Sequence, residues 1–69
     1  MGDPRLGSRL KELRTAAGFT QQGLADKAGV SRKTINTVEN GVFIPSTIVA
    51  LDLARALNTT VEAIFYRKD

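Results

Sequence analysis

The chain has 69 residues, a formal net charge of +3, and neither cysteine nor histidine. A domain this short buries only about 60% of the surface that its unfolded chain exposes, so we expect one domain with a small core. The composition excludes a disulfide framework, a zinc site of the Cys/His type and catalysis by either side chain, and we expect no metal and no cofactor. No apolar run approaches the roughly 18 residues of a membrane span, which predicts a cytoplasmic protein with no membrane partner.

Positive charge is concentrated in the first half of the sequence. Residues 1–37 carry seven basic and three acidic side chains, a net charge of +4, whereas residues 38–69 carry three basic and four acidic ones, a net charge of −1. This asymmetry indicates one half that faces a polyanion and another half with a different role. Charges that only solvate helix faces would give the same pattern.

The first half contains three predicted helices. The first is predicted by apolar residues at helical spacing, namely Leu6, Leu10, Leu13 and Ala17. Gly18 is expected to end it. Thr20 is the expected N-cap of a second helix of about two turns, and Gly29 is its expected stop. Ser31 caps a third helix, which the turn at Asn40-Gly41 closes.

The second half contains two predicted helices and no strand. Pro45-Ser46 begins a helix that is apolar over much of its circumference, so it is either central to the core or shared with a partner. Its two apolar stripes are Ile48, Leu51, Ala54 and Leu57, and Val49 and Leu53. Asn58 is expected in the left-handed conformation at its end. Thr59 or Thr60 then caps a short last helix containing Val61, Ile64 and Phe65.

Residues 21–40 have the spacing of two short helices that cross at a steep angle. Such a crossing requires small or flexible residues at specific positions. Ala25 would face the third helix without forcing the two helices apart, and Gly29 supplies the positive φ of the turn. Val30 would fill the corner beneath the turn. The remaining apolar positions would hold the pair to the rest of the domain: Leu24, Ala28, Ile35 and Val38.

Further short sequence motifs follow one another along the chain, before, within and after this pair of helices. They are Leu10-Lys11-Glu12-Leu13-Arg14, Thr20-Gln21-Gln22, Leu24-Ala25, Gly29-Val30-Ser31-Arg32, Thr34-Ile35-Asn36, Glu39-Asn40-Gly41, Pro45-Ser46 and Val61-Glu62-Ala63-Ile64-Phe65. From about residue 6 to residue 66 the chain resembles the Cro and lambda-repressor type of helix-turn-helix regulators, the Xre family. The resemblance implies an all-α, compact five-helix DNA-binding domain over residues 1–69, with the helix-turn-helix at about 21–40. It also implies a transcriptional regulator, expected to be a repressor.

The resemblance places the third helix in the major groove of double-stranded DNA. It implies base contacts from Ser31, Arg32, Lys33 and Thr37, with Asn36 beside them. Arg32 and Lys33 can donate to guanine O6 and N7, while Ser31 and Thr37 can adapt or touch a thymine methyl group. A solvated charged face with a capping Ser31 is the structural alternative.

Phosphate contacts are expected from both ends of the motif. Gln21 begins the second helix, whose N-terminal N–H groups favour anions, and Asn40 follows the third helix. Arg9 or Lys11 would add a contact from the first helix. For Asn40, a role as helix C-cap is equally compatible with the sequence.

An internal ion pair between Arg14 and Glu39 is also implied by the resemblance. A planar guanidinium suits a partly buried carboxylate, so Arg14 is interpreted as structural. Two positions depart from the family pattern. Gly23 stands where a glutamate usually closes a capping box with Thr20, and Ile48 stands at a usually polar position beside Thr47, where an apolar residue is usual. The latter indicates a local exchange of buried and exposed positions or an added contact between subunits.

One short recognition helix, the helix that enters the major groove, makes too few base contacts to select a single genomic site. We therefore expect a homodimer on an inverted-repeat operator. A two-fold dimer places its recognition helices about 34 Å apart. The apolar, slightly acidic region 46–66 is the candidate dimerisation region. The interface residues expected within it are Asn58, Thr59, Val61, Glu62 and Phe65, with Ile48 and Tyr66 as outer members. Core packing is the alternative for Val61 and Phe65, and the favoured reading for Ile64.

Two other classes of function are the alternatives to operator binding. An antitoxin or adaptor of the same fold would have a protein as its main partner, but would not need a basic third helix. An enzyme is not expected, because the sequence has no paired carboxylates at a recognisable spacing and no glycine-rich phosphate loop. The sequence indicates no small-molecule ligand.

Overall fold

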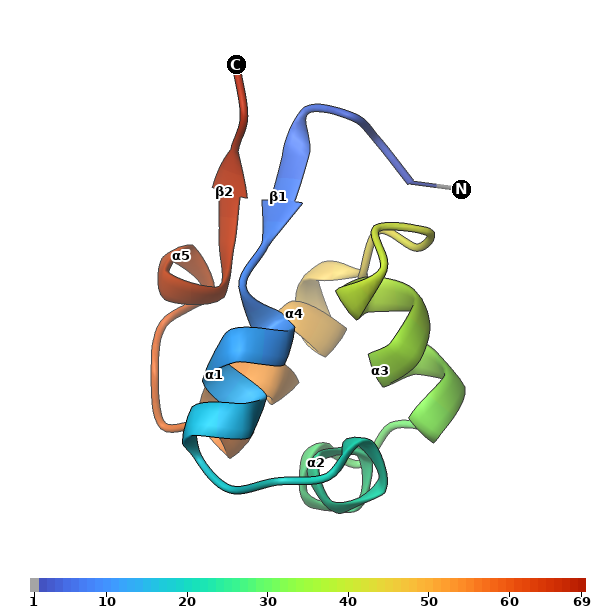
Figure 1. Ribbon diagram of the computed structural model, residues 1–69, viewed down its shortest axis with the longest axis vertical. Helices are drawn as coiled ribbons and strands as arrows, with labels where there is room; N and C mark the ends of the chain where they lie inside the picture. Colours follow the sequence, from blue (N-terminus) through green and yellow to red (C-terminus); the bar gives the residue numbers. More distant parts are fainter. Residues whose placement is uncertain (1) are drawn as a thin grey trace.

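The computed structural model describes residues 2–69, which form five α-helices and a two-stranded antiparallel sheet (Figure 1). The elements in chain order are β1 (Leu6–Ser8), α1 (Leu10–Ala16), α2 (Gln21–Ala28), α3 (Arg32–Glu39), α4 (Thr47–Ala56), α5 (Val61–Ile64) and β2 (Phe65–Arg67). The predicted five-helix fold is confirmed.

Four helices begin at a hydroxyl side chain that accepts a hydrogen bond from the first turn. The donor–acceptor pairs are Gly23 N to Thr20 Oγ1 (2.9 Å), Thr34 N to Ser31 Oγ (3.1 Å), Val49 N to Ser46 Oγ (3.2 Å) and Ala63 N to Thr60 Oγ1 (3.1 Å). Such a cap contributes about 1 kcal/mol to helix stability. Thr60, not Thr59, caps α5. The positive φ angles predicted at Gly29 and Asn58 are present, and Gly18, which was expected to end the first helix, also has a positive φ.

The prediction of no strand was wrong, because the two ends of the chain pair with each other. Leu6 lies in β1 instead of the first helix, and Phe65 begins β2 instead of continuing α5. The register places Gly7 opposite Tyr66. A Cβ atom at Gly7 would lie 2.2 Å from Cζ of Tyr66, so a side chain at this position would displace the ring. An aromatic ring that covers a glycine across the strands supports the pairing of such short strands.

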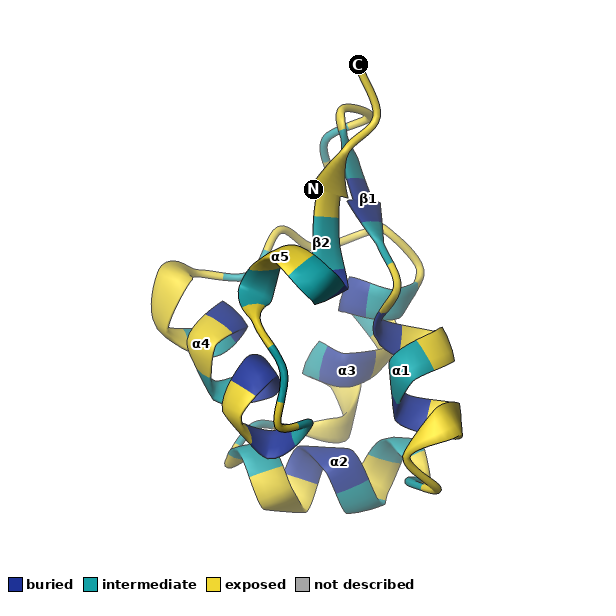
Figure 2. Cartoon of the chain, turned by 90° about the vertical axis from the view of Figure 1, so that its left-hand side faces the viewer, coloured by how far each residue is buried: buried dark blue, intermediate teal, exposed yellow. Residues whose placement is uncertain are grey.

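The core lies where the five helices meet (Figure 2). Its fully buried members include Leu10, Leu24, Ala25, Ile35, Leu53 and Ile64. The predicted stripe of the first helix was wrong at Ala17, whereas part of the apolar surface of α4 is exposed, one of the two arrangements expected for that helix. Ala17 is exposed at the end of α1, and Ile48 and Leu51 of α4 are 64% and 51% exposed. On α4, the buried face is formed instead by Ala50, Leu53, Ala54 and Ala56.

Gly23 weakens α2 and is a site for stabilisation. We expect Gly23→Glu to raise the free energy of unfolding by about 1 kcal/mol, because glycine inside a helix costs about that much relative to alanine. The new carboxylate can also accept from the backbone N–H of Thr20 and complete the capping box. A Cβ at this position would lie 3.1 Å from Thr20 Oγ1, so the hydroxyl must shift slightly.

Urea denaturation followed by circular dichroism measures this change. Gly23→Ala is the matched control, because it adds helix propensity without the carboxylate. Lower stability in both variants would mean that the crowding of Thr20 outweighs the gain in propensity.

Candidate nucleic-acid interface

The turn between α2 and α3 sets the direction of the second helix of the motif. Gly29 has φ 74° and its N–H donates to Ala25 O, which ends α2 abruptly. Ala25 is fully buried, as expected for a residue facing α3. Ile35 and Val38 hold the inner face of α3 in the core. The outer face therefore presents the exposed residues Ser31, Arg32, Lys33, Asn36 and Asn40.

The basic side chains of α3 differ from those of the sheet in having no carboxylate partner. Within residues 2–69, Arg5 pairs with Asp3 and Arg67 pairs with Asp69, each at 2.8 Å. Hydrogen bonds from Arg5 lower the pKa of Asp3 to about 2, and Arg67 likewise lowers the pKa of Asp69. Both carboxylates are therefore charged at neutral pH and offset the guanidinium charges. In that same part of the chain, neither Arg32 nor Lys33 forms an ion pair, so their positive charge is available to a ligand.

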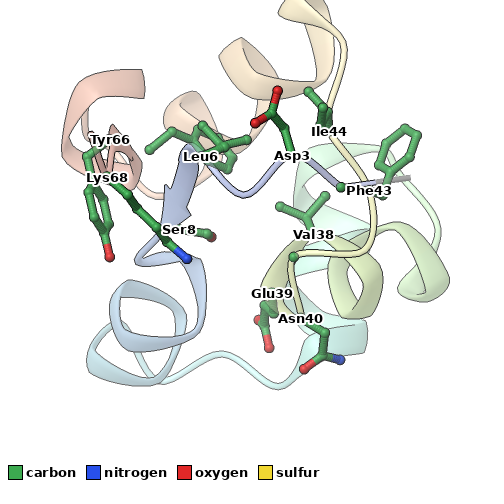
Figure 3. A pocket seen from close by; sticks show the side chains of 13 residues that line it. Asp3, Leu6, Ser8, Val38, Glu39, Asn40, Phe43, Ile44, Tyr66 and Lys68 are labelled. Atoms are coloured by element: carbon green, nitrogen blue, oxygen red, sulfur yellow. The ribbon is translucent and has the colours of Figure 1, made fainter.

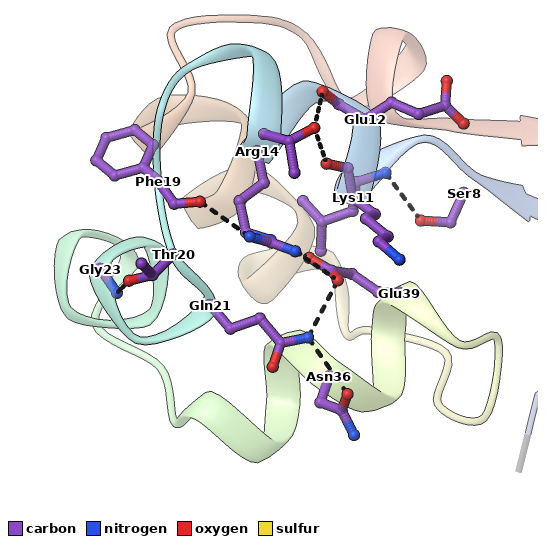
Figure 4. Close-up of polar contacts among 12 residues, drawn as sticks. Ser8, Lys11, Glu12, Arg14, Phe19, Thr20, Gln21, Gly23, Asn36 and Glu39 are labelled. Carbon is purple, nitrogen blue, oxygen red and sulfur yellow. Dashed lines mark hydrogen bonds and ion pairs between the residues drawn. The ribbon is translucent and has the colours of Figure 1, made fainter.

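The predicted partners Arg14 and Glu39 lie together beneath this face (Figure 4). Arg14 Nε lies 2.6 Å from Glu39 Oε2, and Nη2 lies 3.3 Å from Oε1. Arg14 Nη1 also donates to Phe19 O at 2.9 Å. The two side chains are only 10% and 3% exposed. This bidentate pair joins the end of α3 to α1 and to the segment before α2.

A chain of side-chain amides extends from the ion pair to the surface. Gln21 Nε2 donates to Glu39 Oε1 at 3.2 Å and to Asn36 Oδ1 at 3.3 Å, and Asn40 Nδ2 donates to the same Asn36 oxygen at 3.1 Å. Both amide protons of Gln21 are thus engaged within the protein, whereas Asn36 Nδ2 remains available as a donor. Sequence reasoning identified these residues but missed the network, since each bond joins side chains from different turns or helices.

Ser31 and Asn40 act as helix caps at the two ends of α3. Ser31 Oγ accepts from Thr34 N, and the N–H of Asn40 donates to Asn36 O at 3.1 Å. Asn40 also lines a pocket of about 190 Å³ between the end of α3 and the sheet, where Ser8 and Lys68 lie on the opposite side (Figure 3).

The two basic candidates of the first helix have different surroundings. Arg9 directly precedes α1, and its guanidinium carbon lies 4.1 Å from the centroid of the Tyr66 ring. The Tyr66 ring therefore lies close to both Gly7 and Arg9, at the sheet. Lys11 is exposed in the first turn of α1.

The residues predicted for dimerisation separate into two groups. Val61 and Phe65 line an apolar groove of about 240 Å³ between α4, α5 and β1, together with Leu6, Ile44, Pro45, Thr47, Ala50 and Leu51. Ile48 is exposed on α4. Asn58, Thr59, Glu62 and Tyr66 do not line this groove. Sequence reasoning missed Ile44 and Leu51, since exposed apolar residues have the same sequence pattern as core residues.

None of the helices in residues 2–69 has the length and apolar character required to cross a membrane.

Two crossed helices, the second of which presents unpaired basic side chains, define a helix-turn-helix DNA-binding domain. Residues 10–64 match the model of the family described as Helix-turn-helix, and the chain belongs to this family.

Several relatives and solved structures are similar to the chain. It is 32% identical over 62 residues to the HTH-type transcriptional regulator YgzD of Bacillus subtilis strain 168. The aligned region covers 90% of this chain and 94% of the relative. It is 44% identical over 57 residues to an HTH-type transcriptional regulator of Methanothermobacter thermautotrophicus, covering 81% and 83%. The crystal structure of the restriction-modification controller protein C.AhdI from Aeromonas hydrophila is 41% identical, with a TM-score of 0.75 and coverage of 78% and 82%. A structure of the SinR protein in complex with the SinI protein is 27% identical, with a TM-score of 0.75 and coverage of 80% and 54%. The protein is a transcriptional regulator with a helix-turn-helix DNA-binding fold.

Proposed function

We propose that the protein is a cytoplasmic repressor that binds an inverted-repeat operator as a homodimer, with α3 of each copy in the major groove. The observation that carries this proposal is the charge of α3. Arg32 and Lys33 are exposed and have no acidic partner within residues 2–69, whereas Arg5 and Arg67 of the sheet region are neutralised. Unpaired donors at the start of a groove-binding helix are suited to guanine O6 and N7.

The remaining contacts divide into those that read bases and those that position the domain. Asn36 has a free Nδ2 donor next to Arg32 and Lys33, and suits base contact. Asn40, Arg9 and Lys11 are exposed at the flanks and suit phosphates. At the start of α2, Thr20 caps the Gly23 N–H, and the N–H groups of Gln21 and Gln22, which precede it in the first turn, can bind a phosphate. The Gln21 side chain then contributes by fixing Asn36 and Glu39, or exchanges one of those bonds for a phosphate.

The apolar groove supports the dimer. It joins the exposed side chains Ile44 and Leu51 to the partly buried Val61 and Phe65, and Ile48 adds a further exposed apolar residue on α4. In the view of Figure 1, α5 lies on the opposite side of the molecule from α3. Pairing through this surface leaves both recognition helices open to DNA. Asn58, Thr59 and Glu62 would form its polar rim, as is typical of such interfaces.

Selection of bound sequences from a random DNA pool at stated salt tests the proposal. The expected result is an inverted repeat whose half-site centres are about one helical turn apart. A single half-site would contradict the dimer, and the absence of any enriched sequence would contradict operator binding. Placing the selected site across a reporter promoter should lower expression, and increased expression would contradict the repressor role.

Arg32→Ala and Lys33→Ala should each relax base preference at particular operator positions. The loss expected for one bidentate base contact is about 1–3 kcal/mol. Binding to a panel of single-base operator variants measures this effect. Lys11→Ala is the control, because loss of a phosphate contact weakens all sequences alike. If the Arg32 and Lys33 variants lost affinity uniformly, a different face of the protein would lie in the groove.

A further inference from the structure

A second groove, of about 310 Å³, lies directly beside the exposed face of α3 that carries Arg32 and Lys33. It is lined by Ser31, Lys33, Thr34, Thr37, Val42 and Phe43. The loop after α3 is folded back to form its wall, because Val42 N and Phe43 N both donate to Thr37 O, at 2.9 and 3.3 Å. Val42 is 57% exposed and Phe43 is 42% exposed. Two large apolar side chains thus stand open to solvent next to the basic face.

The hydroxyl groups around this groove are engaged by their own helix. Thr37 Oγ1 donates to Lys33 O at 2.8 Å and lies 3.2 Å from Thr34 O. Thr34 Oγ1 lies 2.9 Å from Ser31 Oγ, which also caps the helix. Thr37 therefore has no hydroxyl proton left for a base edge. Its Oγ1 can still accept a hydrogen bond, and its methyl group is the apolar part that it can contribute to the groove also lined by Val42 and Phe43.

An apolar groove within a DNA-binding face has a specific chemical counterpart. Among the groups that base pairs present in the major groove, the C5-methyl group of thymine is the apolar one. A second copy of the chain seated in the groove would have to supply a carboxylate to the Lys33 ammonium, because burial of that charge without a partner is costly. The groove is also continuous with the face that carries Arg32 and Lys33.

We propose that Thr37, Val42 and Phe43 form a pocket that recognises the methyl group of an operator thymine. The inference rests on the proposed operator binding, and assigns a specificity-determining role to the loop after α3. Burial of the methyl group against Val42 and Phe43 would favour thymine over cytosine at one position of each half-site. This discrimination needs no hydrogen bond, since it comes from burial of the methyl group.

Replacement of single operator thymines by deoxyuridine tests the proposal, because it removes one methyl group and preserves every base-pairing group. One position in each half-site should show an affinity loss of about fourfold, the value expected for one buried methyl group. In Val42→Ala and Phe43→Ala the same replacement should cost less than in wild type. Thr15→Ala is the control, because Thr15 is exposed on α1 and lines neither this groove nor the groove proposed for dimerisation. It should retain the full deoxyuridine penalty.

The outcomes separate this inference from the proposed function. Sequence-specific binding that is insensitive to deoxyuridine at every thymine, or a penalty that Val42→Ala and Phe43→Ala leave unchanged, would overturn the methyl pocket and leave operator binding intact. Loss of dimerisation in these two variants, measured by light scattering, would show that the groove binds a second copy instead. Absence of sequence-specific binding would overturn both proposals. Equal melting temperatures for the variants and wild type establish that the comparison concerns folded proteins.

Discussion

Arg14→Met is expected to lower the free energy of unfolding by about 3–5 kcal/mol, because it leaves the Glu39 carboxylate buried without its partner. The Glu39 side chain is only 3% exposed, so water cannot replace the guanidinium without a rearrangement of α3. The variant also removes the donor to Phe19 O. Domains of this kind are stable by only about 5–15 kcal/mol, so the loss is a large share of the total. Urea denaturation followed by circular dichroism measures it.

Two further variants separate charge from packing at this pair. Arg14→Lys keeps the charge, but an ammonium cannot reproduce the planar guanidinium that donates to both Glu39 oxygens and to Phe19 O. Its free energy of unfolding should therefore lie between those of wild type and Arg14→Met. The double variant Arg14→Met with Glu39→Met should be more stable than Arg14→Met alone, because no unpaired charge remains. If Arg14→Met cost less than about 1 kcal/mol, the Glu39 carboxylate would have to reach water in solution.

Ile48→Asp is expected to yield a folded monomer whose operator affinity is lower by about 10²–10⁴-fold, the range associated with loss of the second of two linked binding modules. Ile48 is 64% exposed in the isolated chain, so the substitution has little effect on the core. A charge placed in the proposed dimer contact would be buried without a partner. Light scattering at micromolar concentration gives the mass, and a DNA titration gives the affinity.

Ile48 is a sharper test site than Phe65 or Val61, because both of those residues also pack against the core. An aspartate at either position would weaken folding and association together. Thr15→Asp is the matched control, since it adds the same charge at an exposed position of α1, a helix that contributes no residue to the groove. It should remain dimeric. A wild-type protein that is monomeric both free and on DNA would contradict the proposed interface.

The helix-turn-helix could be predicted because its determinants are local. The hydroxyl caps act within one turn, and Ala25 and Gly29 constrain the crossing of two consecutive helices. The sheet could not be predicted in this way. Its strands are too short to show an alternating pattern, and they pair residues from opposite ends of the sequence. Leu6 therefore fitted the helical spacing of Leu10 and Leu13, although its backbone is extended.

The candidate site was predictable in its residue types but not in its hydrogen bonding. The basic residues of α3 follow from their position in the motif, whereas the engagement of Gln21 by Glu39 and Asn36 depends on side-chain geometry across two helices. The solvent exposure of apolar side chains could not be predicted from the sequence either. Val42, Phe43 and Leu51 have the residue types of a core, and only the packed structure shows that they face solvent.

The pairing of β1 with β2 also has a consequence for how the chain folds. Contacts between residues near opposite ends close a loop of almost the whole chain, whose entropic cost must be met before the contact stabilises anything. The two helices of the DNA-binding motif are instead adjacent in sequence and can associate early. We therefore expect Gly7 and Tyr66 to gain their native contact after the folding transition state, so that the sheet controls how fast the native protein opens more than how fast it forms.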